Sequence, residues 1–194
     1  MLSYKESLKI LKETNALLEG HFVLSSGLHS AQYVQCAQLL SKPYKSAEFC
    51  KSLAEKISIE FKEIDIILSP AMGGIIIGHE IGRLLNKETI FSERVEGEFK
   101  LRRGFKIPKN CKVLIVEDVI TTGKSSIECS KLVEAAEALI IGFACLIDRS
   151  NGNFSVNKKI ISQIEINIPT YKSDNLPKDL ISLPAIKPGS RELK

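Results

Sequence analysis

The segment from Val113 to Ser126 contains the residues of this chain that are best suited to chemistry. A short apolar run typical of a buried strand leads directly into two adjacent carboxylates, Glu117 and Asp118, and a loop rich in hydroxyl groups and glycine follows. Carboxylates accept hydrogen bonds from vicinal sugar hydroxyls, and the free N–H groups at the start of a helix favour an anion. This order of groups indicates a ligand in which a ribose carries a phosphate.

The loop at residues 121–125, T-T-G-K-S, supplies hydroxyl donors and a glycine that can take a positive φ. Its last three letters imitate the end of a nucleoside-triphosphate P-loop, but that motif requires a glycine where this chain has Asp118. No dinucleotide-binding G-x-G-x-x-G is present either. Taken alone, Glu117 and Asp118 could form a solvated turn with Asp118 capping the next helix. The loop that follows them favours the sugar phosphate.

The pattern of apolar residues predicts the elements that position this segment. Short apolar runs without polar alternation predict five strands, at residues 64–68, 89–91, 113–116, 139–147 and 159–166. Helical periodicity predicts helices between or before them, at residues 44–61, 75–85 and 125–138. Unbroken apolar strands separated by helices are typical of a parallel sheet covered on both faces. We therefore expect an α/β fold with a central parallel sheet flanked by helices.

The two ends of the chain are expected to lie outside this sheet. The periodicity of Tyr4–Leu18 predicts an amphipathic helix that stops at Gly20, and residues 21–40 predict a small two-stranded unit. The proline-containing tail from Pro169 to Lys194 is expected to wrap the surface as a loop. We expect residues 1–194 to form a single domain, in which residues 1–40 and part of the tail make a small N-terminal hood.

Three segments directly follow predicted strands, namely residues 69–74, residues 117–125 and the pair Asp148-Arg149. Open parallel sheets bind their ligands at the carboxyl ends of the strands. The segments are therefore expected to meet at one edge of the sheet. Their convergence carries more weight than any one of them alone.

Bulk composition narrows the class of protein. The net charge of +4 permits anionic small molecules but lacks the basic density of a nucleic-acid binder. No apolar stretch approaches the roughly 20 residues that span a bilayer, and the N-terminus shows no secretory signal. The five scattered cysteines indicate reduced thiols in a cytoplasmic protein, and neither they nor the three histidines have the spacing of metal ligands.

The segment V-L-I-V-E-D-V-I-T-T-G-K-S-S resembles the phosphoribosyl diphosphate (PRPP) signature of the type I phosphoribosyltransferases. Among these, the chain most resembles the orotate phosphoribosyltransferases, over nearly its whole length. Residues 21–33 match that family's N-terminal F-x-L-x-S-G-x-x-S-x-x-Y segment, and residues 69–75 take the place of its diphosphate-contacting loop. Residues 146–149 match the strand end whose arginine contacts the base. The PRPP signature alone specifies only the superfamily; the N-terminal segment and Arg149 favour orotate.

The resemblance implies a role for each residue of the signature. Glu117 and Asp118 would hold the 2′- and 3′-hydroxyls of the ribose, and the loop would wrap the 5′-phosphate. The implied PRPP-binding residues are Glu117, Asp118, Val119, Ile120, Thr121, Thr122, Gly123, Lys124 and Ser125. Thr121 would also lie near the orotate, and Arg149 would contact the orotate ring or its carboxylate, where a guanidinium fork matches the acceptor geometry. Without such a ligand, Arg149 would be a solvated cation paired with Asp148.

The stretch from residue 91 to 106 carries five cations around two glycines. It is expected to be either a charged surface hairpin or the mobile loop that the family closes over the diphosphate. Arg94 and Lys100 are the candidates for diphosphate contact. The chain departs from the best-known members here, because this stretch has no histidine and Met72-Gly73 stands where they have lysine. No catalytic general acid is identified.

The resemblance implies a glycosyltransferase that combines orotate with PRPP, with Mg²⁺ held chiefly by PRPP itself. The products would be orotidine 5′-monophosphate and diphosphate, in pyrimidine (UMP) biosynthesis. A homodimer is also implied. The alternatives are a purine-base phosphoribosyltransferase and a non-catalytic, PRPP-sensing regulator on the same fold. A regulator would normally bring a DNA-binding module, for which the segment before Phe22 is short.

Overall fold

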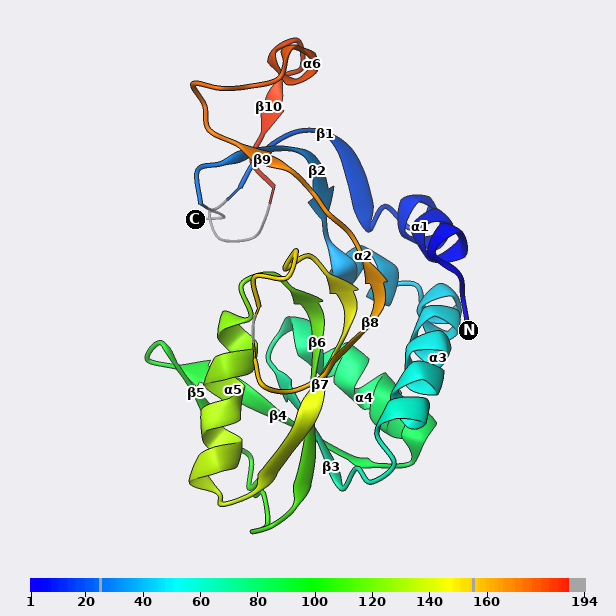
Figure 1. Ribbon diagram of the computed structural model, residues 1–194, viewed down its shortest axis with the longest axis vertical. Helices are drawn as coiled ribbons and strands as arrows, with labels where there is room; N and C mark the ends of the chain where they lie inside the picture. The colour runs from blue at the N-terminus through cyan, green and yellow to red at the C-terminus, as the bar shows by residue number, and fades with distance from the viewer. Residues whose placement is uncertain (25, 155, 189–194) are drawn as a thin grey trace.

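The computed structural model describes residues 1–24, 26–154 and 156–188. These residues form a six-stranded sheet with the order β5-β4-β3-β6-β7-β8 and a separate four-stranded sheet with the order β10-β1-β2-β9. Figure 1 shows the larger sheet in the lower body of the molecule and the smaller sheet standing above it. We call the smaller sheet and its helices the hood.

The six-stranded sheet is parallel except at one edge. Its parallel strands are β3 (Ile66–Pro70), β4 (Glu88–Val95), β6 (Lys112–Ile120), β7 (Leu139–Asp148) and β8 (Ile160–Glu165). The edge strand β5 (Glu98–Leu101) runs antiparallel to β4, so that part of the charged stretch at residues 91–106 forms a hairpin. The predicted α/β class with a central parallel sheet is confirmed, with one antiparallel strand added.

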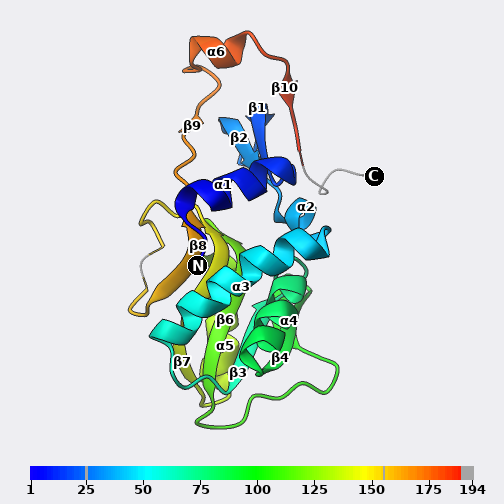
Figure 2. The ribbon, with the colours of Figure 1, turned by 90° about the vertical axis from the view of Figure 1, so that its right-hand side faces the viewer.

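Helices cover both faces of this sheet. Figure 2 shows α3 (Pro43–Glu60) and α4 (Gly73–Leu85) on the face turned to the viewer, with α5 (Lys124–Ala135) behind the sheet. Along β6, Leu114 and Val116 belong to the core under α3 and α4, whereas Val113 and Ile115 belong to the core under α5. Because successive side chains of a strand point to opposite faces, a strand buried on both faces must be apolar throughout. The unbroken apolar runs of the sequence have this origin.

The hood combines the two ends of the chain. From the N-terminal side come α1 (Tyr4–Glu13), β1 (Leu17–Val23), β2 (His29–Val34) and α2 (Cys36–Leu40). The tail adds β9 (Thr170–Tyr171), α6 (Lys178–Ile181) and β10 (Ala185–Ile186). Strand β9 pairs with β2 and β10 pairs with β1, so the tail contributes strands and a short helix where a surface loop was expected. The last predicted tail residues, 189–194, lie outside the described residues.

The first helix is shorter than predicted. It ends at Glu13, whereas the sequence pattern extended it to Leu18. The Thr14 hydroxyl donates to the carbonyl oxygen of Ile10 at 2.8 Å, and Asn15 adopts a positive φ of 58°, which ends a helix. Residues beyond this turn form β1, because pairing with β2 decides their conformation over their local helical pattern. No helix within the described residues is long and apolar enough to cross a membrane.

Candidate active site

The two signature carboxylates lie near the carboxyl end of β6 on opposite faces of the strand. The Glu117 side chain is 5% exposed on the α5 face, where it accepts a hydrogen bond from the Ser126 hydroxyl at 2.9 Å. Burial raises the pKa of Glu117 to about 7; the Ser126 hydrogen bond lowers it and the nearby charge of Asp118 raises it further. Burial also raises the pKa of Asp118, against hydrogen bonds from backbone N–H groups.

Asp118 faces the start of α4. A Cβ atom placed on Gly73 would lie only 2.7 Å from Oδ2 of Asp118, so the loop after β3 approaches this carboxylate as closely as a glycine allows. Gly74 is similarly crowded, because its Cβ would come within 3.2 Å of the Val116 carbonyl oxygen. The first turn of a helix leaves its N–H groups free, and these favour an anion. The start of α4 thus brings anion-binding groups next to an acceptor for sugar hydroxyls.

The loop after β6 leads into the start of a second helix. Thr121, Thr122 and Lys124 are exposed, and Gly123 takes a left-handed conformation with φ of 69° as the residue before α5. The Ile120 side chain is fully buried, so only its backbone is available to a ligand. The loop therefore presents hydroxyl groups together with the free N–H groups of a helix N-terminus, as a phosphate requires.

Arg149 follows the end of β7, beside this loop. Its backbone N–H donates to the Ile120 carbonyl oxygen at 2.8 Å, while its half-buried side chain forms no ion pair within the described residues. The Nε atom is buried and has no hydrogen-bond partner there. Asp148, its expected partner in the absence of a ligand, instead accepts a hydrogen bond from the N–H of Ser150 at 2.7 Å. A half-buried guanidinium group whose buried Nε lacks a partner is suited to an anionic ligand.

The hood brings two further residues to Arg149. Burial lowers the pKa of the Arg149 guanidinium, and the nearby side chains of Tyr33 and Cys36 oppose this shift. The Cys36 thiol also donates to the Asp118 carbonyl oxygen at 3.7 Å, which joins the start of α2 to the end of β6. The residue pattern alone predicts no site role for Tyr33 or Cys36. The available signal was the N-terminal motif that ends at Tyr33.

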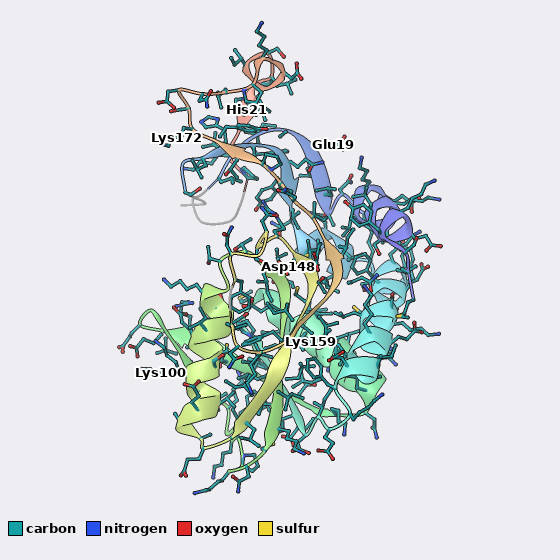
Figure 3. The ribbon with its side chains drawn as sticks, in the orientation of Figure 1. Glu19, His21, Lys100, Asp148, Lys159 and Lys172 are labelled. Atoms are coloured by element: carbon teal, nitrogen blue, oxygen red, sulfur yellow. The ribbon has the colours of Figure 1, made fainter. Side chains whose placement is uncertain are left out.

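The two predicted diphosphate-contacting cations lie on the β4–β5 hairpin and have partners there. Nη2 of Arg94 lies 2.5 Å from Oε2 of Glu128 on α5, and its guanidinium group lies 4.2 Å from the centre of the Phe99 ring. Lys100 lies 3.9 Å from Glu96 near the hairpin turn. Figure 3 shows Lys100 well away from Asp148 at the end of β7. In this structure Arg94 is joined to α5 through Glu128, and Lys100 is paired within its own hairpin.

The histidines of the hood pair with each other. Nε2 of His21 lies 2.6 Å from Nδ1 of His29, and Nδ1 of His21 lies 3.1 Å from the Leu183 carbonyl oxygen. Figure 3 places His21 in the hood, apart from Asp148. No group of three or more His, Cys, Asp or Glu side chains within the described parts of the chain could hold a metal ion.

Residues 44–175 match the family described as the phosphoribosyl transferase domain. Fold and site thus define the class, a phosphoribosyltransferase, as the PRPP signature predicted. Close relatives identify a more specific family within this class. The orotate phosphoribosyltransferase of Parvibaculum lavamentivorans is 50% identical over 95% of this chain and 97% of that protein. The orotate phosphoribosyltransferase of Maricaulis maris is 45% identical over 97% of each. The chain belongs to the orotate phosphoribosyltransferase family.

Solved structures agree with the fold. Orotate phosphoribosyltransferase from Aeropyrum pernix is 23% identical and matches with a TM-score of 0.72, over 81% of this chain and 92% of that chain. Adenine phosphoribosyltransferase from Thermoanaerobacter pseudethanolicus is 18% identical and matches with a TM-score of 0.62, over 70% of this chain and 88% of that chain. Because proteins named for two different bases share it, the fold does not select the base.

Proposed function

We propose that the protein transfers the ribose 5-phosphate group of PRPP to orotate, which gives orotidine 5′-monophosphate and diphosphate in pyrimidine (UMP) biosynthesis. The observation that carries the choice of base is the buried Nε of Arg149, which lacks a partner among the described residues and lies beside the signature loop. A guanidinium fork pairs well with a carboxylate, which orotate has and adenine lacks. The close relatives named for orotate support the same choice.

The ribose and its phosphate are proposed to bind at the end of β6. Asp118 is the direct acceptor of ribose hydroxyls, because it faces the start of α4 and is only half-buried. Glu117 is the second proposed acceptor, but its carboxylate is more deeply buried and already bonded to Ser126. The 5′-phosphate would accept hydrogen bonds from the free N–H groups at the start of α5 and from the hydroxyl groups of the loop.

The diphosphate is proposed to lie at the start of α4, where Gly73 and Gly74 let backbone N–H groups approach. We propose that Mg²⁺ arrives with PRPP, since Asp118 is the only signature carboxylate on that face and Mg²⁺ commonly binds through substrate phosphates. When bound, the ion neutralises charge on the leaving diphosphate. Arg94 would add positive charge only by leaving Glu128.

The reaction requires little from the protein beyond positioning and charge. Departure of the diphosphate leaves positive charge on the ribose, and a nitrogen of orotate attacks the opposite face. Asp118 orients the ribose, Arg149 with Thr121 orients the orotate, and the α4 start stabilises the leaving group. Holding the two reactants in line lowers the barrier mainly by removing the cost of their encounter.

We also propose a homodimer. Met72, the residue before α4, is 84% exposed, Ile76 on α4 is 55% exposed, and Tyr44 at the start of α3 is 74% exposed. Exposed large apolar side chains at the starts of two helices are suited to an interface with a second copy. Light scattering coupled to gel filtration tests this, and a monomer mass at micromolar concentration would refute it.

A cytoplasmic location remains part of the proposal, supported by five free and buried cysteines.

The experiment that tests the function follows the ultraviolet absorbance of orotate after protein, PRPP and Mg²⁺ are mixed. A time-dependent fall that disappears without Mg²⁺ is expected. Turnover of adenine or hypoxanthine but not orotate would establish the purine alternative. Binding of PRPP without turnover of any base would establish the non-catalytic regulator.

A further inference from the structure

The chain that follows Arg149 folds back onto the phosphate loop. The N–H of Ser150 donates to the Asp148 carboxylate at 2.7 Å, and the N–H of Asn153 donates to the Ser150 carbonyl oxygen at 2.9 Å. These bonds form a tight turn that ends at Phe154. The Phe154 side chain is 5% exposed, which is unusual burial for a residue on a connecting loop.

The Phe154 ring lies directly against Gly123. A Cβ atom placed on Gly123 would lie 2.0 Å from Cδ2 and 2.3 Å from Cε2 of the ring, so the ring fills the space that a side chain would need. On its other side, the ring meets Phe143 of β7 edge to face, with centroids 5.4 Å apart and planes at 76°. Phe143 is itself 2% exposed, so the sheet supports the ring from behind.

Gly123 is the residue whose conformation starts α5. Its left-handed φ of 69° turns the chain from the loop into the helix and thereby aims the first N–H groups of the helix. A glycine in this conformation has other conformations open to it at low cost, because it lacks a Cβ. A backbone hydrogen bond from the Ile127 N–H to the Gly123 carbonyl oxygen at 2.9 Å restrains only part of this freedom. A rigid ring packed against the glycine removes that freedom.

We propose that Phe154 is a positioning residue for the phosphate loop: its ring holds Gly123 in the left-handed conformation and so fixes the N–H groups that receive the 5′-phosphate of PRPP. The role rests on the proposed function of the loop and deepens it. A ring that merely filled the core would affect stability. A ring that sets the geometry of the loop affects the binding of PRPP separately from stability, because recognition by N–H groups depends on their direction.

The test compares Phe154→Leu with the unchanged enzyme. Leucine keeps the site apolar but lacks the flat ring, so the loop gains freedom. We expect the KM for PRPP to rise between about 10-fold and 100-fold. The KM for orotate and kcat should change by no more than about twofold, because the Arg149 N–H remains bonded to Ile120. Calorimetry with ribose 5-phosphate should show the same loss of affinity as PRPP.

Two further variants separate positioning from general destabilisation. Phe49→Leu removes a fully buried ring from α3, on the opposite face of the sheet, and should lower Tm while leaving the KM for PRPP unchanged. Phe154→Tyr keeps the ring edge that contacts Gly123 and should retain the KM of the unchanged enzyme. An equal rise in the KM for both substrates in Phe154→Leu, or a Phe49→Leu variant with the same kinetic profile, would overturn the proposal.

If Phe154→Leu fails to fold, the contact between Phe154 and Gly123 can be tested by substituting the glycine instead. Gly123→Ala places a methyl group against the ring and should raise the KM for PRPP. Combining it with Phe154→Leu should recover part of the loss, since the smaller side chain makes room, and strict additivity would contradict the contact. If the unchanged protein did not turn over orotate, the proposed function would fail, while calorimetry with ribose 5-phosphate would still decide the role of Phe154.

Discussion

The two halves of the site are assembled in different ways. The ribose-phosphate half comes from the end of β6, the loop after it and the start of α5, which are continuous in sequence, with α4 beside them. The base half joins Arg149 after β7 to Tyr33 and Cys36 of the hood. The first half is built mainly from one continuous segment, with the Phe154 ring packed against Gly123, whereas the second depends on how the hood sits on the sheet. A substitution in one half should therefore change the kinetic constants for the substrate bound there more than those for the other substrate.

The largest effect is expected from Asp118→Asn. The variant keeps the shape of the side chain but weakens acceptance of ribose hydroxyls, so kcat/KM for PRPP should fall about 100-fold. Steady-state kinetics with varied PRPP measures this. Asp65→Asn is the matched control, because Asp65 bonds the Lys112 N–H at the other end of β6. An unchanged kcat/KM for PRPP in Asp118→Asn would remove Asp118 from the ribose site.

Arg149→Ala tests the base half. Loss of the guanidinium group should raise the KM for orotate about 30-fold, and the KM for PRPP should rise far less. Arg83→Ala, which removes an exposed arginine paired with Glu80, is the control for charge alone. A similar rise for both substrates would argue against contact with the base.

Glu117, the more deeply buried of the two signature carboxylates, should make the stability of the protein depend on pH. Its pKa is raised from 4.5 to about 7, so the folded state binds more protons than the unfolded state between these pH values. The free energy of unfolding should therefore decrease as the pH rises from 4.5 to 7, by on the order of 2 kcal/mol. Asp118, whose pKa is also raised, contributes in the same direction.

Urea unfolding at several pH values measures this slope, and Glu117→Gln should flatten it. Glu63→Gln, at an exposed carboxylate near the other end of the sheet, should leave the slope in place. A slope that stays the same in Glu117→Gln would show that the buried carboxylate of Glu117 is not its source.

Tyr33→Phe should give the smallest effect. Removing one hydroxyl near Arg149 should raise the KM for orotate about threefold and leave the KM for PRPP unchanged, because the hood does not form the phosphate loop. Tyr4→Phe, at an exposed position on α1, is the control. A larger change in the KM for PRPP than in that for orotate would contradict the division of the site into two halves.

The sequence predicted the sheet and the phosphate loop because both depend on local patterns. Apolar runs marked the strands, and the order of carboxylates, hydroxyls and glycine marked the loop. The prediction ended the strand at Val116, whereas β6 continues to Ile120. The alternation of faces therefore extends through Glu117 and Asp118 and sends them to opposite sides.

Contacts between segments that are distant in the sequence could not be predicted from local patterns of residues. Strands β9 and β10 have two residues each and form only because β1 and β2 offer free edges. The ion pair between Arg94 and Glu128 joins residues 34 positions apart, and the local sequence around neither residue predicts it. The packing of Phe154 against Gly123 was missed for the same reason.

The pairing of the first strands with the last has a consequence for synthesis on the ribosome. All strands of the large sheet and the phosphate loop precede residue 166, so this part has its whole sequence before the tail emerges. Strand β1 pairs with β2 along one edge, but its other edge stays unpaired until β10, at residues 185–186, has emerged. Because chains emerge from the N-terminus and segments fold as their partners become available, the phosphate half should be in place before the hood is complete. A nascent chain stalled before the tail should protect the phosphate loop from proteolysis while the edge of β1 that pairs with β10 remains unpaired.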